Sequence, residues 1–289
     1  MSVYAITDIH GRYDLWSMVK DYLTDDDVLY CLGDCIDRGH YGYDIISEMM
    51  DMPNVHLIMG NHEWMMVDTL MRDNWWRIEA NQLWNMNGGK YTLWQIEEKL
   101  STPEDDSQVK MFAEEVQRFA KTLFYKNTKG QMIILNHCGF TPGKGYEPYW
   151  DRHHFGDCWP DESILSEDMC NTYIIHGHTP VQAMNKYYYK YWYDKTKVVE
   201  NNIKEDIGEN RDIKVRVLKY CDGHKINLDL GSVTSDTTVL LNLDTFEEIY
   251  FYKKYEPDDI DKTEQEIAEQ EAKISSFSDK DWRLASLFM

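Results

Sequence analysis

Four short motifs in this chain combine carboxylate, amide or imidazole side chains with glycine. They are Asp8-Ile9-His10-Gly11, Gly33-Asp34-Cys35-Ile36-Asp37-Arg38-Gly39, Gly60-Asn61-His62-Glu63 and His176-Gly177-His178-Thr179-Pro180. The first three each follow a short apolar run typical of a β-strand. Carboxylate and imidazole groups are ligands of manganese, iron and zinc. The motifs together predict a metal centre built at strand ends.

The candidate ligands divide into two sets around Asp34. Asp8 and His10 are two residues apart, so their side chains point the same way from an extended segment. The Asp34 carboxylate at the next strand end can bridge to a second ion. The other ligands expected for that second ion are Asn61, His137 and His178. Two ions about 3.5–4 Å apart hold a phosphoryl group and acidify a bridging water, and the resulting hydroxide can attack phosphorus.

Hydrolysis of a phosphoester also requires a proton for the leaving group. His62 follows the candidate ligand Asn61 and is the expected general acid, with Asp37 to orient it and raise its pKa. Arg38 and Arg152 carry the planar guanidinium that binds phosphate oxygens through two hydrogen bonds. Each motif alone has a structural explanation, such as a helix N-terminus at 60–63. Their order after successive strands favours the metal centre.

The elements that must position these motifs alternate along the first 63 residues. Strand-like runs at 3–7, 28–32 and 55–59 are separated by helical patterns at 13–23 and 43–50. In open α/β sheets, ligands collect beyond the carboxyl ends of the strands. Further strands are expected at 131–135, 173–175, 226–230, 238–243 and 248–252.

Three other regions differ from this pattern. Residues 64–126 are rich in Trp and Met and predict a helical cap. We expect its aromatic side chains to be core residues, with the alternative that the segment 84–91 lines a substrate cleft. Residues 186–225, with an aromatic run at 187–193, predict an inserted β-ribbon or lid. We expect a catalytic domain over 1–255 and an acidic helical tail over 256–289, which docks on the body or contacts a partner.

The composition limits the kinds of partner that the protein is expected to bind. With 30 basic and 51 acidic residues, the net charge is −21, which argues against nucleic acid and membrane surfaces because both require a basic face. Bound divalent cations would reverse this field locally for an anionic substrate. The six cysteines show no paired spacing, and neither a signal peptide nor a spanning segment is expected. We expect a cytoplasmic protein with reduced thiols, and the oligomeric state stays open.

The motifs resemble the calcineurin-like metallophosphoesterase superfamily, specifically its phosphoprotein phosphatase branch. The resemblance rests on Asp-x-His-Gly at 8–11, Gly-Asp-x-x-Asp-Arg-Gly at 33–39, Gly-Asn-His-Glu at 60–63 and Gly-His-Thr-Pro at 177–180. The sequence is similar to bacterial and bacteriophage-lambda-type protein phosphatases and to symmetrical diadenosine tetraphosphatases. Trp150-Asp151-Arg152 resembles the Trp-x-Arg segment that supplies a second phosphate-binding arginine in those proteins.

The resemblance covers about residues 1–180 and 226–252. It implies a four-layer α/β/β/α sandwich of two mixed sheets flanked by helices, with the metals at one edge. It implies that one ion is held by Asp8, His10 and Asp34, and the other by Asp34, Asn61, His137 and His178.

The sequence also departs from the family pattern. Thr7 stands where glycine is frequent, and Cys138-Gly139 replaces a Gly-Gly pair. His176 is an additional imidazole, which we expect beside the ligand set rather than in it.

Two kinds of hydrolase fit these residues. A serine/threonine protein phosphatase predicts an open metal cleft, and a dinucleoside polyphosphate hydrolase predicts a deeper pocket with basic and aromatic groups. The lack of a basic cluster near the motifs favours the first, whereas the aromatic run at 187–193 favours the second. A non-catalytic metal-binding scaffold conflicts with the complete ligand set. We expect a protein phosphatase with two divalent ions, Mn²⁺ or else iron or zinc, acting on a phosphorylated protein or small phosphoester.

Overall fold

A computed structural model describes residues 1–73, 78–102, 105–139, 171–182, 215–220 and 223–253 of the chain. The compact unit that contains all described helices and strands runs from Met1 to Tyr252. The expected tail at 256–289 and most of the expected insertion at 186–225 lie outside the described residues, so both stay predictions.

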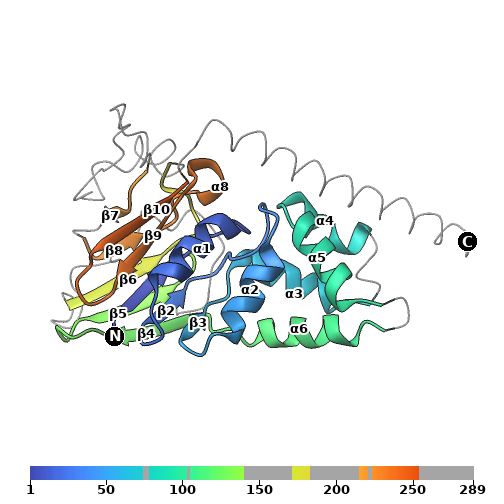
Figure 1. Ribbon diagram of the computed structural model, residues 1–289, viewed down its shortest axis with the longest axis horizontal. Helices are drawn as coiled ribbons and strands as arrows, with labels where there is room; N and C mark the ends of the chain where they lie inside the picture. Colours follow the sequence, from blue (N-terminus) through green and yellow to red (C-terminus); the bar gives the residue numbers. More distant parts are fainter. Residues whose placement is uncertain (74–77, 103–104, 140–170, 183–214, 221–222, 254–289) are drawn as a thin grey trace, which may run out of the picture. The chain divides into compact units, whose positions relative to one another are not determined.

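The first sheet has five strands in the order β10-β9-β1-β2-β3 (Figure 1). Its parallel strands are β1 (Val3–Ile6), β2 (Val28–Cys31) and β3 (Val55–Leu57). The antiparallel strands β9 (Thr237–Asn242) and β10 (Glu248–Tyr252) complete it on the β1 side. The parallel strands are connected by α1 (Tyr13–Tyr22) and α2 (Gly42–Asp51).

The second sheet has five strands in the order β4-β5-β6-β8-β7. They are β4 (Thr122–Lys126), β5 (Met132–Asn136), β6 (Thr172–His176), β8 (Lys225–Asn227) and β7 (Leu218–Tyr220). The pairs β5–β6 and β6–β8 are parallel, and the two outer pairs are antiparallel. The expected fold class is confirmed: two mixed sheets are flanked by helices.

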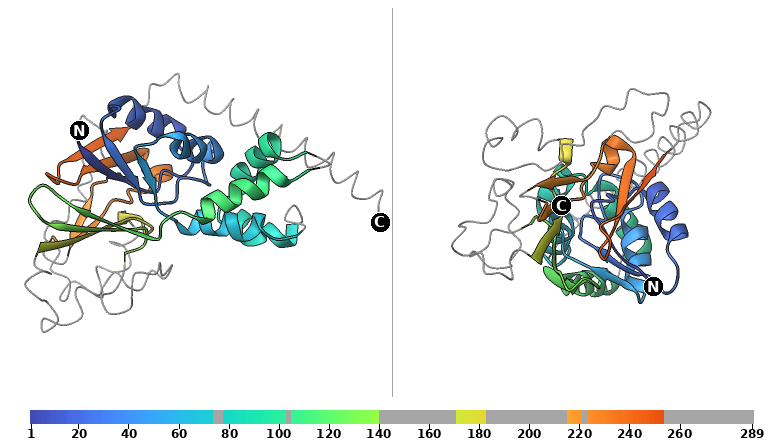
Figure 2. Two further views of the ribbon diagram at one scale, coloured as in Figure 1. Left: turned by 90° about the horizontal axis from the view of Figure 1, so that it is seen from below. Right: turned by 90° about the vertical axis from the view of Figure 1, so that its left-hand side faces the viewer.

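Alternation along β1 separates the two layers of the core. Tyr4 and Ile6 pack in the cluster that includes α1 and α2, whereas Val3 and Ala5 pack with residues of the second sheet such as Ile133. Successive side chains of a strand point to opposite faces, so β1 is covered on both sides. Figure 2 shows α1 and α2 on the face of the first sheet that lies away from the second sheet.

The predicted helical cap contains four helices. They are α3 (Asn61–Leu70), α4 (Ile78–Met86), α5 (Lys90–Leu100) and α6 (Ser107–Gln117). Trp84, Ile96 and Phe112 extend the helix-side core into this lobe. The lobe ends earlier than 126, because the residues of β4 pair with β5 and form the edge of the second sheet.

The end of the expected insertion belongs to the second sheet. Val215, Val217 and Leu218 are buried in the core between the sheets, and β7 pairs with β8. The alternating sequence there forms an edge strand of the body. Among the described residues, no helix combines the length and the apolar character needed to cross a bilayer.

Candidate active site

The motifs converge because their strands end at the same edge. Backbone hydrogen bonds join the loops after β1 and β2: Asp8 N–H donates to the Gly33 carbonyl at 3.0 Å, and His10 N–H to the Asp34 carbonyl at 3.0 Å. In the second sheet, Gly177 N–H donates to the His137 carbonyl at 2.8 Å. These backbone hydrogen bonds hold the loops side by side independently of their side chains.

Backbone strain is concentrated in the same loops. Eight described residues other than glycine have a positive φ, and six of them belong to the motifs. Such left-handed conformations cost on the order of 1–3 kcal/mol each and persist where the surroundings over-determine them, typically at functional sites. The six are Asp8, His10, Asp34, Asp37, Arg38 and His178.

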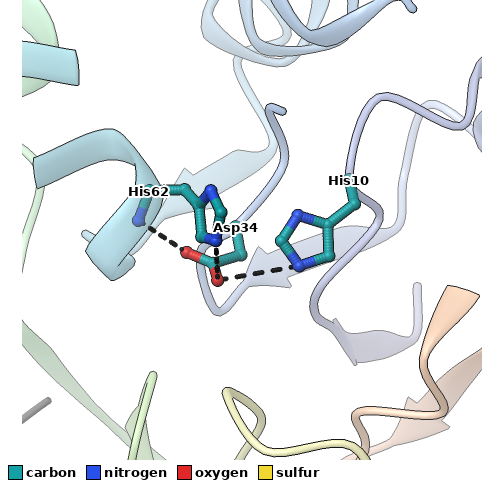
Figure 3. A group of neighbouring side chains, drawn as sticks. All are labelled: His10, Asp34 and His62. Atoms are coloured by element: carbon teal, nitrogen blue, oxygen red, sulfur yellow. Dashed lines mark hydrogen bonds and ion pairs between the residues drawn. The ribbon is translucent and has the colours of Figure 1, made fainter. Parts of the chain in front are cut away.

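The first group of candidate ligands lies at the ends of β1 and β2. His10, Asp34 and His62 offer ligand atoms that all lie within 4.8 Å of one another (Figure 3). His10 Nε2 is 3.8 Å from both Asp34 Oδ2 and Asp8 Oδ1. His10 Nδ1 lies 3.0 Å from the Ile36 carbonyl, so donation of the Nδ1 proton leaves Nε2 unprotonated, as a ligand atom must be.

Asp8 is held with one oxygen available. Its Oδ2 accepts hydrogen bonds from Thr7 Oγ1 at 2.6 Å and from His178 N–H at 3.0 Å. Its Oδ1 is buried and has no hydrogen-bond partner among the described residues. Because a buried polar atom without a partner is costly, this oxygen fits a ligand to a cation. Thr7, which departs from the family pattern, thus helps to orient Asp8.

The second group contains the other expected ligands. Asp34, His137 and His178 offer ligand atoms within 4.8 Å of one another. Asn61 Oδ1 lies 3.1 Å from His137 Nε2 and 2.8 Å from His178 Nδ1. His137 Nδ1 lies 2.7 Å from the Leu32 carbonyl, which fixes the orientation of the ring.

Asp34 is the residue shared by both groups. Its Oδ2 lies 3.4 Å from His137 Nε2 and 3.8 Å from His62 Nε2, and its Oδ1 accepts a hydrogen bond from His62 N–H at 3.0 Å. Although burial opposes ionisation, His137 and His62 hold the pKa of Asp34 well below its usual range. Asp34 is therefore ionised at neutral pH, which is the form that binds a cation.

Glu63 supports this arrangement and was not recognised from the sequence as a site residue. Its carboxylate is fully buried and accepts backbone hydrogen bonds from Asp34 and Cys35 at 2.8 Å each and from Gly60 at 3.1 Å. Burial raises the pKa of Glu63 to about 7. Its place three residues after Gly60 is the glutamate position of a capping box, which is the available sequence signal.

Glycine at position 60 is required by the same contacts. A Cβ added there would overlap Asp34 Oδ1 and would lie 2.5 Å from Glu63 Oε2. The glycine therefore allows the first turn of α3 to approach the central carboxylate directly.

His62 and Asp37 form the expected pair. His62 Nδ1 lies 2.7 Å from Asp37 Oδ2, and both side chains are buried. Burial disfavours the charged imidazole, but Asp34 and Asp37 outweigh it and raise the pKa of His62. Asp37 therefore orients the ring so that Nε2 faces Asp34.

Arg38 is exposed at the mouth of the site. Its Nη1 lies 2.7 Å from His10 Nε2, and its Nη2 lies 3.0 Å from His62 Nε2. The guanidinium thus lies between a candidate ligand and the candidate acid. Arg152, the second predicted arginine, lies outside the described residues.

Comparison with known families agrees with this geometry. A sequence model of the family described as calcineurin-like phosphoesterase matches residues 1–197. The chain belongs to the calcineurin-like phosphoesterase family. Both candidate ligand groups lie within the matched residues.

A short segment of the chain matches a curated relative. The symmetrical bis(5'-nucleosyl)-tetraphosphatase of Salmonella paratyphi A is 34% identical over 67 residues, which make up 22% of this chain and 24% of that protein. The match therefore spans only about a quarter of that curated relative.

Solved structures match over most of the chain at low identity. A metallophosphoesterase from Sphaerobacter thermophilus is 12% identical with a TM-score of 0.48, covering 93% of this chain and 95% of that one. A cold-active protein-tyrosine phosphatase of a Shewanella species is 18% identical with a TM-score of 0.46, covering 87% and 77%. Similarity at this level does not distinguish substrates.

The remaining residues singled out from the sequence lie around the site of the phosphoesterase. His176 is in neither ligand group: its Nε2 lies 2.7 Å from Tyr220 Oη, and burial lowers its pKa to about 3. This position beside the ligand set is the one expected. Of the cysteines in the described ranges, Cys31, Cys35 and Cys138 are buried.

Proposed function

We propose that this phosphoesterase is a serine/threonine-type protein phosphatase with a dinuclear metal centre. The observation that carries the proposal is the position of Asp34, whose carboxylate belongs to both ligand groups and also contacts His62. One residue thereby links the candidate metal ligands to the candidate proton donor. Such an arrangement suits cleavage of a phosphorus–oxygen bond, where charge on phosphate and a proton for the leaving oxygen are both needed.

The two ions are assigned to the first group with Asp8 in place of His62, and to the second group with Asn61 added. We infer that one is held by Asp8, His10 and Asp34, and the other by Asp34, Asn61, His137 and His178. Manganese is the proposed metal, with iron and zinc as alternatives that the same oxygen and nitrogen donors accept. When bound, two such ions neutralise phosphate charge and make water a nucleophile at neutral pH.

The other roles belong to the side chains around the metals. His62 donates a proton from Nε2 to the leaving oxygen, and Asp37 holds the ring through Nδ1. Arg38 binds phosphate oxygens with a guanidinium that is exposed at the mouth of the site. Arg152 is proposed as a second phosphate-binding group, on the sequence resemblance alone.

Charge supports a phosphorylated protein as the substrate. In the described part of the chain, Arg38 is the basic side chain whose guanidinium lies within 3.0 Å of the candidate ligand His10 and the candidate acid His62. A tetraphosphate carries more negative charge than a phosphomonoester, and the net charge of −21 repels it more strongly. The same charge supports the proposal that nucleic acids and membrane surfaces are not partners.

A symmetrical dinucleoside tetraphosphate hydrolase is the second candidate. The 67-residue match to a symmetrical bis(5'-nucleosyl)-tetraphosphatase favours it, although this segment is 24% of that relative. Hydrolysis of both substrates would use the same metal groups and the same proton donor.

We predict a higher kcat/KM for phosphoserine and phosphothreonine peptides than for diadenosine tetraphosphate. The assay uses the full chain, stripped of metal and reloaded with Mn²⁺, with 4-nitrophenyl phosphate as a control for activity of the centre. A large preference for the dinucleotide would overturn the proposed substrate. Turnover of 4-nitrophenyl phosphate alone would contradict both proposed substrates, but it would still support hydrolysis of a phosphoester by the metal centre.

A further inference from the structure

A tryptophan of the helical lobe contacts the proposed acid–base pair. Trp84, in α4, is completely buried, and its indole Nε1–H donates a hydrogen bond to Asp37 Oδ2 at 2.7 Å. The same oxygen lies 2.7 Å from His62 Nδ1. One carboxylate oxygen thus accepts from the candidate acid on one side and from the helical lobe on the other.

The turn before α5 and the first turn of α5 also contact the backbone of Asp37 and Arg38. Asp37 N–H donates to Thr92 Oγ1 at 3.0 Å, and Arg38 N–H donates to the Gly88 carbonyl at 2.9 Å. Both residues have a positive φ, of 70° and 64°. Since L-residues rarely adopt this conformation, these hydrogen bonds from the lobe stabilise it.

Glycine 89 allows the indole to reach this position. A Cβ added at Gly89 would overlap the Trp84 ring. Because Trp84 is 0% exposed, it does not line a substrate cleft, which was one expectation for the segment 84–91. Its indole instead contacts Asp37, in the loop after β2.

We propose that Trp84 is a positioning residue for proton transfer, which holds the Asp37 carboxylate in the orientation that aligns His62. The inference rests on the proposed role of His62 as general acid. Asp37 Oδ1 is buried and has no hydrogen-bond partner among the described residues. His62 and Trp84 contact Asp37 Oδ2, and the Thr92 side chain also hydrogen-bonds to this carboxylate. Removal of the indole donor therefore weakens the hold on the orientation of Asp37 toward His62.

Trp84→Phe tests this role, because it removes the N–H and keeps an aromatic ring. We expect kcat for phenyl phosphate, which has a poor leaving group, to fall by about 10- to 100-fold, as small misplacements of catalytic groups do. For 4-nitrophenyl phosphate, whose leaving group needs little protonation, the change should stay below about threefold. Bound metal per chain and KM should match the parent.

A second substitution separates the effect of losing the indole N–H from the effect of losing side-chain volume. Benzothienylalanine at position 84 replaces the indole N–H with sulfur at nearly the same size, and we expect the same leaving-group dependence. Trp16→Phe is the matched control, since Trp16 is equally buried and its Nε1–H donates to Glu48 at 2.9 Å, away from the motifs. Trp16→Phe should lower stability without a leaving-group effect.

The His62→Asn background separates the possible outcomes. If Trp84 acts through His62, Trp84→Phe should cause no further loss of phenyl phosphate hydrolysis in that background. A loss that is equal for both substrates, or that adds fully to the loss in His62→Asn, would overturn the inference and indicate a structural role. If His62→Asn itself shows no leaving-group dependence, the general-acid assignment fails, which is a different result.

Discussion

Replacement of Asp34 by alanine is expected to abolish hydrolysis, with kcat lowered by about 10³-fold or more, because the metals that activate water lose their shared ligand. The Asp34 carboxylate belongs to both groups of ligand atoms, and its Oδ2 lies within 3.8 Å of His10, His62 and His137. No other described residue has this position. The variant should therefore bind fewer than two ions, and its hydrolysis of any phosphoester should fail.

The measurement combines kcat for 4-nitrophenyl phosphate with metal content of the purified variant. Asp244→Asn is a suitable control, because Asp244 also accepts hydrogen bonds, from Tyr125 and the Thr128 amide, but is not in either ligand group. The control should keep its metals and its activity. An Asp34→Ala protein that retains two ions would contradict the bridging role.

His62→Asn is expected to lower kcat by about 10²- to 10⁴-fold, the range typical for loss of a positioned acid. Metal content should be unchanged, because the contact of residue 62 with Asp34 Oδ1 is made by the backbone N–H, which asparagine retains. Metal content is also decisive for another reason: the His62 ring lies close enough to His10 and Asp34 to be a ligand itself. Loss of one ion in this variant would assign His62 to the metal centre instead.

Leaving-group dependence distinguishes the two roles further. A variant that lacks the acid should hydrolyse 4-nitrophenyl phosphate much better than phenyl phosphate, relative to the parent. His56→Asn is the matched control, since His56 is exposed on β3 and belongs to neither group. It should behave as the parent does on both substrates.

The placement of the candidate ligands could be predicted from the sequence, because ligands of α/β sheets lie at the carboxyl ends of the strands. Asp8, Asp34 and Asn61 each follow a strand of one parallel set, and the carboxyl ends of such strands meet at one edge. The structure brings them together with His137 and His178 from the second sheet. Short apolar runs followed by polar residues were sufficient for this part.

The supporting residues were harder to predict from the sequence, because the residues that they contact are distant in the chain. Trp84 meets Asp37 across 47 positions, and Glu63 meets the Cys35 amide across 28. Local periodicity assigns Trp84 to a helix but not to a partner. Strand β7 falls within the β-ribbon predicted over 186–225, but its place at the edge of the second sheet was not predicted, because that place depends on pairing with β8.

The central claim is that hydrolysis depends on two divalent ions held around Asp34. The most direct test is titration of the metal-free full chain with Mn²⁺, with bound metal per chain and hydrolysis of a phosphoserine peptide measured on the same samples. The account predicts no turnover without metal, saturation at two ions per chain, and full activity only when both are bound. Turnover by the metal-free protein, or saturation of both binding and activity at a single ion, would contradict it.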